Sequence, residues 1–125
     1  MPEPSADTPL KVEFYSTPND GAVVSEEIKS LLDKQSRTRL GAVIWRLQTG
    51  QLLPRDLGRV SGARGIQELK LTDEGNEYRL YIARVRPRGS LLVLALKFHR
   101  KGGRGAQDQA ISVAQRRLAD WRRRL

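Results

Sequence analysis

Three apolar segments separated by short polar turns dominate the hydrophobic pattern of this 125-residue chain. They span residues 66–71, 77–85 and 91–98, and the TDEGN and RPRGS sequences between them are typical of turns. In the first turn we expect Gly75 and Asn76 to adopt positive φ. The second segment alternates, whereas the third is almost continuously apolar. The pattern predicts an antiparallel β-meander whose last strand is central and buried on both faces.

Apolar residues at helical spacing lie on both sides of this predicted sheet. Residues 25–34 and 36–48 predict two helices forming a hairpin, because each segment places its apolar residues on one face. Ser25, followed by two glutamates, is the expected N-cap of the first helix. Trp45 lies beside the second apolar stripe, and we expect it in the core. Residues 106–125 carry a third stripe and predict a C-terminal helix.

The remaining segments complete the predicted domain. Residues 10–15 alternate and predict a first strand at the edge of the sheet, whereas residues 51–64 predict an irregular linker. Residues 1–9 contain three prolines and predict a disordered leader, which leaves residues 10–125 as one domain. Helices grouped apart from consecutive antiparallel strands indicate an α+β fold, with an N-terminal helical hairpin on a twisted antiparallel sheet and a C-terminal helix.

Charge narrows the choice of partner. Lysine and arginine total 23 against 14 acidic residues, a net charge of +9, which favours nucleic acid, the ribosome or an acidic protein. The absence of cysteine excludes a disulfide framework and thiolate chemistry. The N-terminus lacks the pattern of a secretory signal and no apolar run is long enough to span a bilayer, so we expect a cytoplasmic protein that has no membrane partner.

Candidate chemistry is confined to a group of cations at the end of the last predicted strand. The chain has no phosphate-binding P-loop, no dinucleotide fingerprint and no nucleophile elbow, and its single histidine leaves no transition-metal site, so we expect neither cofactor nor metal. His99 lies among Lys97, Arg100 and Lys101, whose charges disfavour its protonated form. Cations with a proton acceptor suit metal-free RNA cleavage, in which the 2′-hydroxyl attacks the adjacent phosphate. A structural or merely exposed histidine is the alternative.

Four short motifs in order resemble the RelE/ParE toxin superfamily, and within it the phage-derived HigB-like branch. They are PRDL at 54–57, GIQELK at 65–70, YRLY at 78–81 and LALKFHRK at 94–101, and the similarity covers most of residues 10–122. The resemblance implies a compact α+β toxin fold. It also implies a ribosome-dependent mRNA endonuclease that inhibits translation and is neutralised by a cognate antitoxin protein.

The resemblance also assigns expected roles to individual residues. Lys70 replaces the arginine of the family's E-L-R motif, Arg79 matches the phosphate-binding arginine of its Y-R motif, and Arg100 and Lys101 match its K-K pair. The expected catalytic residues are Arg79, Tyr81, His99, Arg100 and Lys101, and the expected RNA- or phosphate-binding residues are Lys70, Tyr78, Arg84, Lys97 and Arg104. Among these, His99, Tyr78 and Tyr81 are the candidates for proton transfer.

Departures from the family pattern keep two other functions open. Leu96 stands where the branch often has histidine, and no tyrosine follows Lys101 to match the late catalytic tyrosine of classical RelE proteins. One alternative is a non-catalytic basic module that binds RNA, DNA or a protein. The other is a ParE-like toxin that acts on gyrase.

Overall fold

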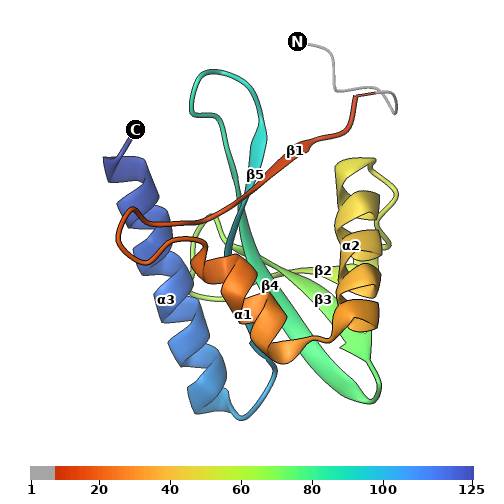
Figure 1. The fold of residues 1–125 in the computed structure, drawn as a ribbon. Coiled ribbons are helices and arrows are strands. Elements are labelled where there is room, and N and C mark those ends of the chain that lie inside the picture. Colours follow the sequence, from red (N-terminus) through yellow and green to blue (C-terminus); the bar gives the residue numbers. More distant parts are fainter. Residues whose placement is uncertain (1–7) are drawn as a thin grey trace.

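The computed structural model describes residues 8–125, which form three α-helices and a five-stranded sheet (Figure 1). All but the last two residues of the predicted leader, 1–9, lie outside the described residues. The elements in chain order are β1 (Lys11–Phe14), α1 (Val23–Leu31), α2 (Lys34–Gln48), the 3₁₀ turn η1 (Pro54–Asp56), β2 (Leu57–Arg59), β3 (Gln67–Asp73), β4 (Asn76–Val85), β5 (Leu92–Arg100) and α3 (Arg104–Arg123).

The strands are ordered β1-β5-β4-β3-β2 across the sheet. The predicted meander of β3, β4 and β5 is confirmed, and β1 is an edge strand as expected. The sheet is mixed rather than antiparallel, because β1 runs parallel to β5. Such a pair needs a long connection, and here both N-terminal helices and three strands lie between its members. The prediction of an irregular linker was wrong at residues 57–59, which pair with β3 although three residues are too few to show an alternating pattern.

The turn between β3 and β4 is a tight two-residue loop. Asp73 pairs with Asn76, so Glu74 and Gly75 occupy the loop, with φ of 51° and 80°. Two successive positive φ values match the twist of a right-handed hairpin. Positive φ was correctly expected at Gly75 but wrongly at Asn76, because pairing with Asp73 already fixes Asn76 within the strand.

A β-bulge interrupts the pairing of β4 with β5. Tyr81 pairs with Lys97, but the next residue, Ile82, pairs with Ala95, so Leu96 has no partner on β4. An extra residue interrupts the regular alternation of side chains between the two faces within the strand that carries it. The two halves of β5 are therefore out of phase by one residue.

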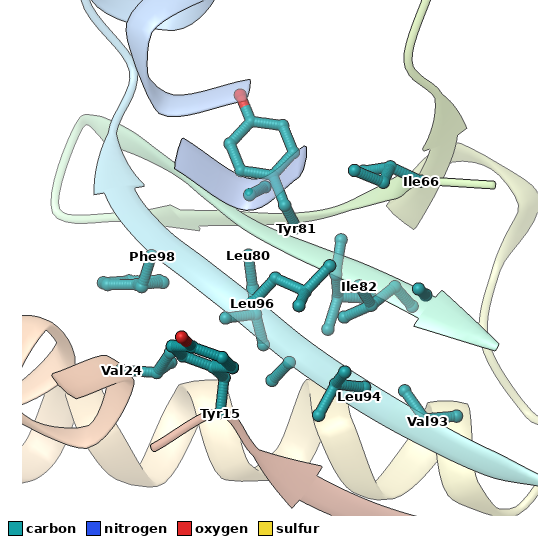
Figure 2. Packing of buried hydrophobic residues seen from close by; sticks show 14 of the residues in the cluster. Tyr15, Val24, Ile66, Leu80, Tyr81, Ile82, Val93, Leu94, Leu96 and Phe98 are labelled. Carbon is teal, nitrogen blue, oxygen red and sulfur yellow. The ribbon is translucent and has the colours of Figure 1, made fainter. Parts of the chain in front are cut away.

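The sheet lies between two helical layers. α1 packs on β5 and α2 on β3, whereas α3 packs on β5 and β4. In Figure 2, Phe98 lies near Val24 of α1, whereas the ring of Tyr81 points away from Leu80 and toward α3. Side chains from both faces of β5, such as Leu94 and Leu96, are fully buried, which confirms the prediction for this strand.

Local sequence explains where the N-terminal helices begin. α1 begins at Val23 after Ala22, so the predicted N-cap, Ser25, is wrong: it lies within the first turn. Asp33 caps α2 and accepts a hydrogen bond from the backbone N–H of Ser36 at 2.8 Å. The hydroxyl of Ser36 in turn donates to Asp73, which also pairs with Arg39, so this buried network ties α2 to the β3–β4 turn.

Trp45 is not in the core, contrary to the prediction. The buried residues Leu40, Val43 and Leu47 form the face of α2 that meets the sheet, and Trp45 lies on the opposite side with 53% of its surface exposed. The aromatic residue next to an apolar stripe was assigned from average burial, which does not determine the direction of one side chain.

Glu27 of α1 closes the part of β5 that β1 does not cover. β1 pairs only as far as Ala95. Beyond it, the backbone N–H of Phe98 donates to Glu27 Oε1 at 3.1 Å, and Lys97 Nζ and Arg117 Nη2 lie 2.8 and 2.9 Å from Glu27 Oε2. Burial acts to raise the pKa of Glu27, but the hydrogen bonds from Arg117, Lys97 and Phe98 outweigh it and lower the pKa. Glu27 thus joins α1, β5 and α3.

Replacement of Glu27 by Gln should destabilise the protein at neutral pH. The variant leaves the partly buried Lys97 and Arg117 without their carboxylate, which we expect to cost about 2 kcal/mol. Because the folded-state pKa is lowered, this contribution is present above the ordinary value of 4.5 and is lost as the pH falls through the folded-state pKa. Urea unfolding of both proteins as a function of pH measures the difference. An equal difference at acidic and neutral pH would contradict this origin.

Substitution of two glycines, one within α2 and one just after it, should change the stability of the protein in opposite directions. Gly41 lies within α2, and an added methyl group would meet nothing within 4 Å, so Gly41→Ala should stabilise the protein by about 0.5–1 kcal/mol. Gly50 has a φ of 73°, so Gly50→Ala should instead be destabilising. Thermal unfolding should show shifts of opposite sign, and equal signs would contradict the local geometry.

Candidate functional site

Five polar side chains share the face of the sheet that meets α3. They are brought together by register, because Glu68 pairs with Tyr81, Tyr81 with Lys97, and Arg79 with His99. Residues two apart on a strand point to the same face, which places Arg79 with Tyr81 and Lys97 with His99. We refer to Glu68, Arg79, Tyr81, Lys97 and His99 as the sheet-face cluster. It contains four of the ten residues predicted for a site.

Tyr81 and His99 form the central pair of the cluster. Tyr81 Oη lies 3.0 Å from His99 Nε2, and the two rings are stacked with centroids 5.4 Å apart and planes 25° from parallel. Burial, and then the charge of Glu68, raise the pKa of Tyr81 to about 12. Burial, and then the charges of Lys97 and Arg79, lower the pKa of His99 below its ordinary 6.5. At neutral pH the structure therefore holds a protonated phenol against a neutral imidazole.

Arg79 lies beneath this pair and is 5% exposed. Its Nη1 donates to the carbonyl of Tyr78 at 3.0 Å, and its Nη2 and Nε lie 3.5 Å from Glu77 Oε1 and 3.8 Å from Glu68 Oε2. Nε is buried and has no hydrogen-bond partner within the described residues. The two carboxylates hold the guanidinium inside the protein, so Arg79 acts on its neighbours and not on a group at the surface.

A groove at the start of α3 borders the cluster. It has a volume of about 370 Å³ and lies between the β2–β3 region and α3, with Arg59, Glu68, Arg104 and Asp108 among its lining residues. Glu68 is the member of the cluster that reaches it. Arg104, predicted to bind RNA, is exposed at this groove. Tyr81 is fully buried, whereas His99 is partly exposed.

The other predicted cations of β5 have separate environments. Lys97 is paired with Glu27 at 2.8 Å, so its ammonium group is not free to bind a phosphate. Arg100 and Lys101 are both exposed where the strand ends. The backbone N–H of Lys101 donates to the carbonyl of Glu77 at 2.7 Å, and its Nζ lies 4.0 Å from a carboxylate oxygen of the same residue. Lys101 is therefore accessible on the side of the sheet that carries His99, whereas Arg100 pairs with Tyr78 and points to the opposite face.

Two residues predicted to bind RNA lie away from the cluster, and a third, Lys70, lies at its edge. Tyr78 belongs to the core, because alternation turns it to the opposite face, where its ring stacks on Phe98 with centroids 5.6 Å apart. Arg84 lies beyond the bulge, bonded to Gln67 at 3.3 Å. Lys70 pairs with Arg79, so its side chain leaves the same face as the cluster, but it lines a different groove, at the edge of β3 beside α2.

Glu68 and Arg59 are the members of this region that sequence analysis did not identify as site residues. Spacing could have identified Glu68, because it lies two residues before the predicted site residue Lys70 and so shares its face of the strand. Its partner on the neighbouring strand is Tyr81. Arg59 gave no such signal, since β2 itself was not predicted.

Within residues 8–125, no three acidic or histidine side chains gather where they could hold a metal ion. No helix in this part of the chain is long and apolar enough to cross a membrane.

Comparison with known proteins identifies the fold. No family model matches the sequence. No curated protein matches it either. Among solved structures, the E. coli toxin RelE, in a free-state mutant with two arginines replaced by alanine, superposes with a TM-score of 0.55. The match covers 83% of this chain and 96% of that one at 12% identity. The chain therefore has the α+β fold seen in the toxin RelE, as the sequence motifs led us to expect.

Proposed function

We propose that this protein is the toxin of a type II toxin–antitoxin system, from the phage-derived HigB-like branch, that cleaves mRNA on the ribosome and so inhibits translation. The observation that carries the proposal is the Tyr81–His99 pair on the sheet face of a RelE-like fold. Two accessible cations, Arg100 and Lys101, lie next to this pair in the chain. The partners would be the ribosome, mRNA and a cognate antitoxin, for which the net charge of +9 favours an acidic binding segment.

The proposed reaction uses a neutral His99 as the general base. In the tautomer whose Nε2–H donates to Tyr81 Oη, the Nδ1 lone pair is free to accept the proton of a ribose 2′-hydroxyl. The 2′-oxygen then bonds to phosphorus, the bond from phosphorus to the 5′-oxygen breaks, and that oxygen takes a proton from water. The products are a 2′,3′-cyclic phosphate and a 5′-hydroxyl. Lys101 would stabilise the negative charge of the crowded phosphate.

Arg79 would be a positioning residue in this mechanism. Its charge lowers the pKa of His99, and its burial between Glu68 and Glu77 keeps it from the surface. Tyr81 would act in the same way, by fixing the tautomer and orientation of the imidazole. The direct contacts with RNA at the site of cleavage would fall to His99 and Lys101, with Arg104 at the groove at the start of α3, and Arg100 would contact RNA only on the other side of the strand.

A brief induction of the protein in a bacterial host tests the proposed function. We expect growth arrest and new 5′ ends within translated mRNAs, mapped by primer extension. His99→Ala should reduce cleavage about a hundredfold or more, the usual contribution of a positioned general base. Arg88→Ala, which alters an exposed cation of the β4–β5 turn, is the matched control and should behave as wild type. Soluble, folded protein that produces neither arrest nor new ends would rule the proposal out.

The pH dependence of cleavage identifies the base. Because the pKa of His99 is lowered, the rate should rise with pH through a value below 6.5 and then remain constant. Arg79→Ala removes one of the charges that lower this pKa, so its profile should shift toward higher pH. Single-turnover cleavage of a model RNA by purified ribosome-bound protein provides the profiles. A rise centred above about pH 8 would instead assign the base to a lysine.

A non-catalytic RNA-binding module is the second candidate. The burial of Tyr81 and Arg79 favours it, because only His99 of the central pair is partly exposed. This function predicts salt-dependent binding through phosphate contacts and no cleavage products. A ParE-like toxin would instead inhibit supercoiling by gyrase while mRNA stays intact, which the same induction experiment distinguishes.

A further inference from the structure

The outer face of α2 exposes a tryptophan that does not contribute to the packing of this helix on the sheet. Trp45 is 53% exposed, and the residues three and four positions before it are Ala42 and Gly41. Helical side chains lean toward the N-terminus, over these positions. A methyl group at Gly41 would meet nothing within 4 Å, so the space there is open. Such a large apolar ring at the surface has no role in the packing of α2 on the sheet.

A basic groove adjoins this tryptophan. It lies between α2, η1 and β3, with a volume of about 570 Å³, and Ala42, beside Trp45, is part of its wall. The cations that line it come from all three elements and are Arg39, Arg46, Arg55 and Lys70. We call the cavity lined by these four cations the α2 groove; Trp45 is not part of its lining but lies one helical turn from Ala42, at its margin. The α2 groove is separate from the groove at the start of α3, with which it shares no lining residue.

The charges of the α2 groove are only partly neutralised. Arg39 is paired with Asp73, but Arg46, Arg55 and Lys70 have no carboxylate within 4.0 Å in the described part of the chain. Of the two acidic residues in the lining, Glu77 already interacts with Arg79 and Lys101. A concave surface with unpaired cations concentrates anions, and phosphates are the anions that arginine binds best.

We propose that the α2 groove is a binding site for single-stranded RNA outside the sheet-face cluster. Its unpaired cations would bind successive phosphates, and an unpaired base would stack on the indole of Trp45. Basic grooves with exposed aromatic rings are the usual means of binding single strands without base-specific contacts. Lys70 leads from this groove toward the cluster, because it pairs with Arg79, which pairs with His99. The choice of RNA rests on the proposed function, but the groove itself does not require cleavage.

Binding to an RNA that cannot be cleaved tests this inference. The probe is a fluorescent 2′-O-methyl oligouridylate of about 12 nucleotides, within the usual range of single-strand sites, whose blocked 2′-oxygen prevents the proposed reaction. We expect Trp45→Ala to weaken binding about tenfold, with Trp45→Phe intermediate. Arg46→Ala and Arg55→Ala should each reduce the slope of log affinity against log salt by about one. Arg88→Ala should bind as wild type, since Arg88 belongs neither to the groove nor to the sheet-face cluster.

The emission of Trp45 provides an independent signal. In a Trp121→Phe background Trp45 is the sole tryptophan, and stacking of a base should quench its fluorescence on titration with the oligonucleotide. Unchanged affinity in both Trp45→Ala and Arg46→Ala would overturn the proposal. So would Trp45-dependent binding of poly-glutamate in place of the oligonucleotide, which would make the groove a protein-docking surface. Because the probe cannot be cleaved, weaker binding by Trp45→Ala supports the groove even if the wild-type protein shows no cleavage, so the failure of the catalytic proposal is distinguishable from the failure of this one.

Discussion

The stability of the sheet depends on how the edge of β5 is completed. A strand edge with unpaired backbone groups is costly when buried and a template for association when exposed. β1 is only four residues long, so the second half of β5 has no neighbouring strand on the edge opposite β4. The carboxylate of Glu27 accepts the N–H of Phe98, while Arg117 donates to the carbonyl of Leu96 at 2.9 Å. Two side chains thus replace a missing strand, and their mutual ion pair holds α1 and α3 beside β5.

This arrangement also explains why the site is assembled at the same place. The ion pair of Lys97 with Glu27 fixes the first residue of the polar half of β5, and His99 follows two positions later on the same face. The imidazole is then held between a fixed neighbour on its own strand and Tyr81 on the next. Preorganisation of this kind comes from the strands and not from loops, so its geometry is as rigid as the sheet.

The sequence was informative where the pattern had a direct physical cause. Period-two alternation and turn residues predicted β3, β4 and β5, and the short motifs predicted the RelE-like fold. The parallel pairing of β1 could not be predicted, because the direction of an edge strand depends on where the helices between it and its neighbour place the chain. The outward direction of Trp45 and the existence of β2 likewise depend on tertiary contacts. In the cluster, residue types were predicted but their burial was not, since alternation alone does not say which face α3 covers.

The bulge at Leu96 has a consequence for how this chain can vary. Because it shifts the phase of β5, the apolar side chain of Leu94 and the polar side chains of Lys97 and His99 occupy one face although two residues, rather than one, lie between Leu94 and Lys97. Removal of Leu96 would leave one residue between Leu94 and Lys97, so the ladder would become regular and both side chains would keep their face. Removal of a residue from either regular half of the strand would instead turn the part beyond it over and exchange buried leucine for charge. The bulge is therefore the place where β5 can change its length at the least cost.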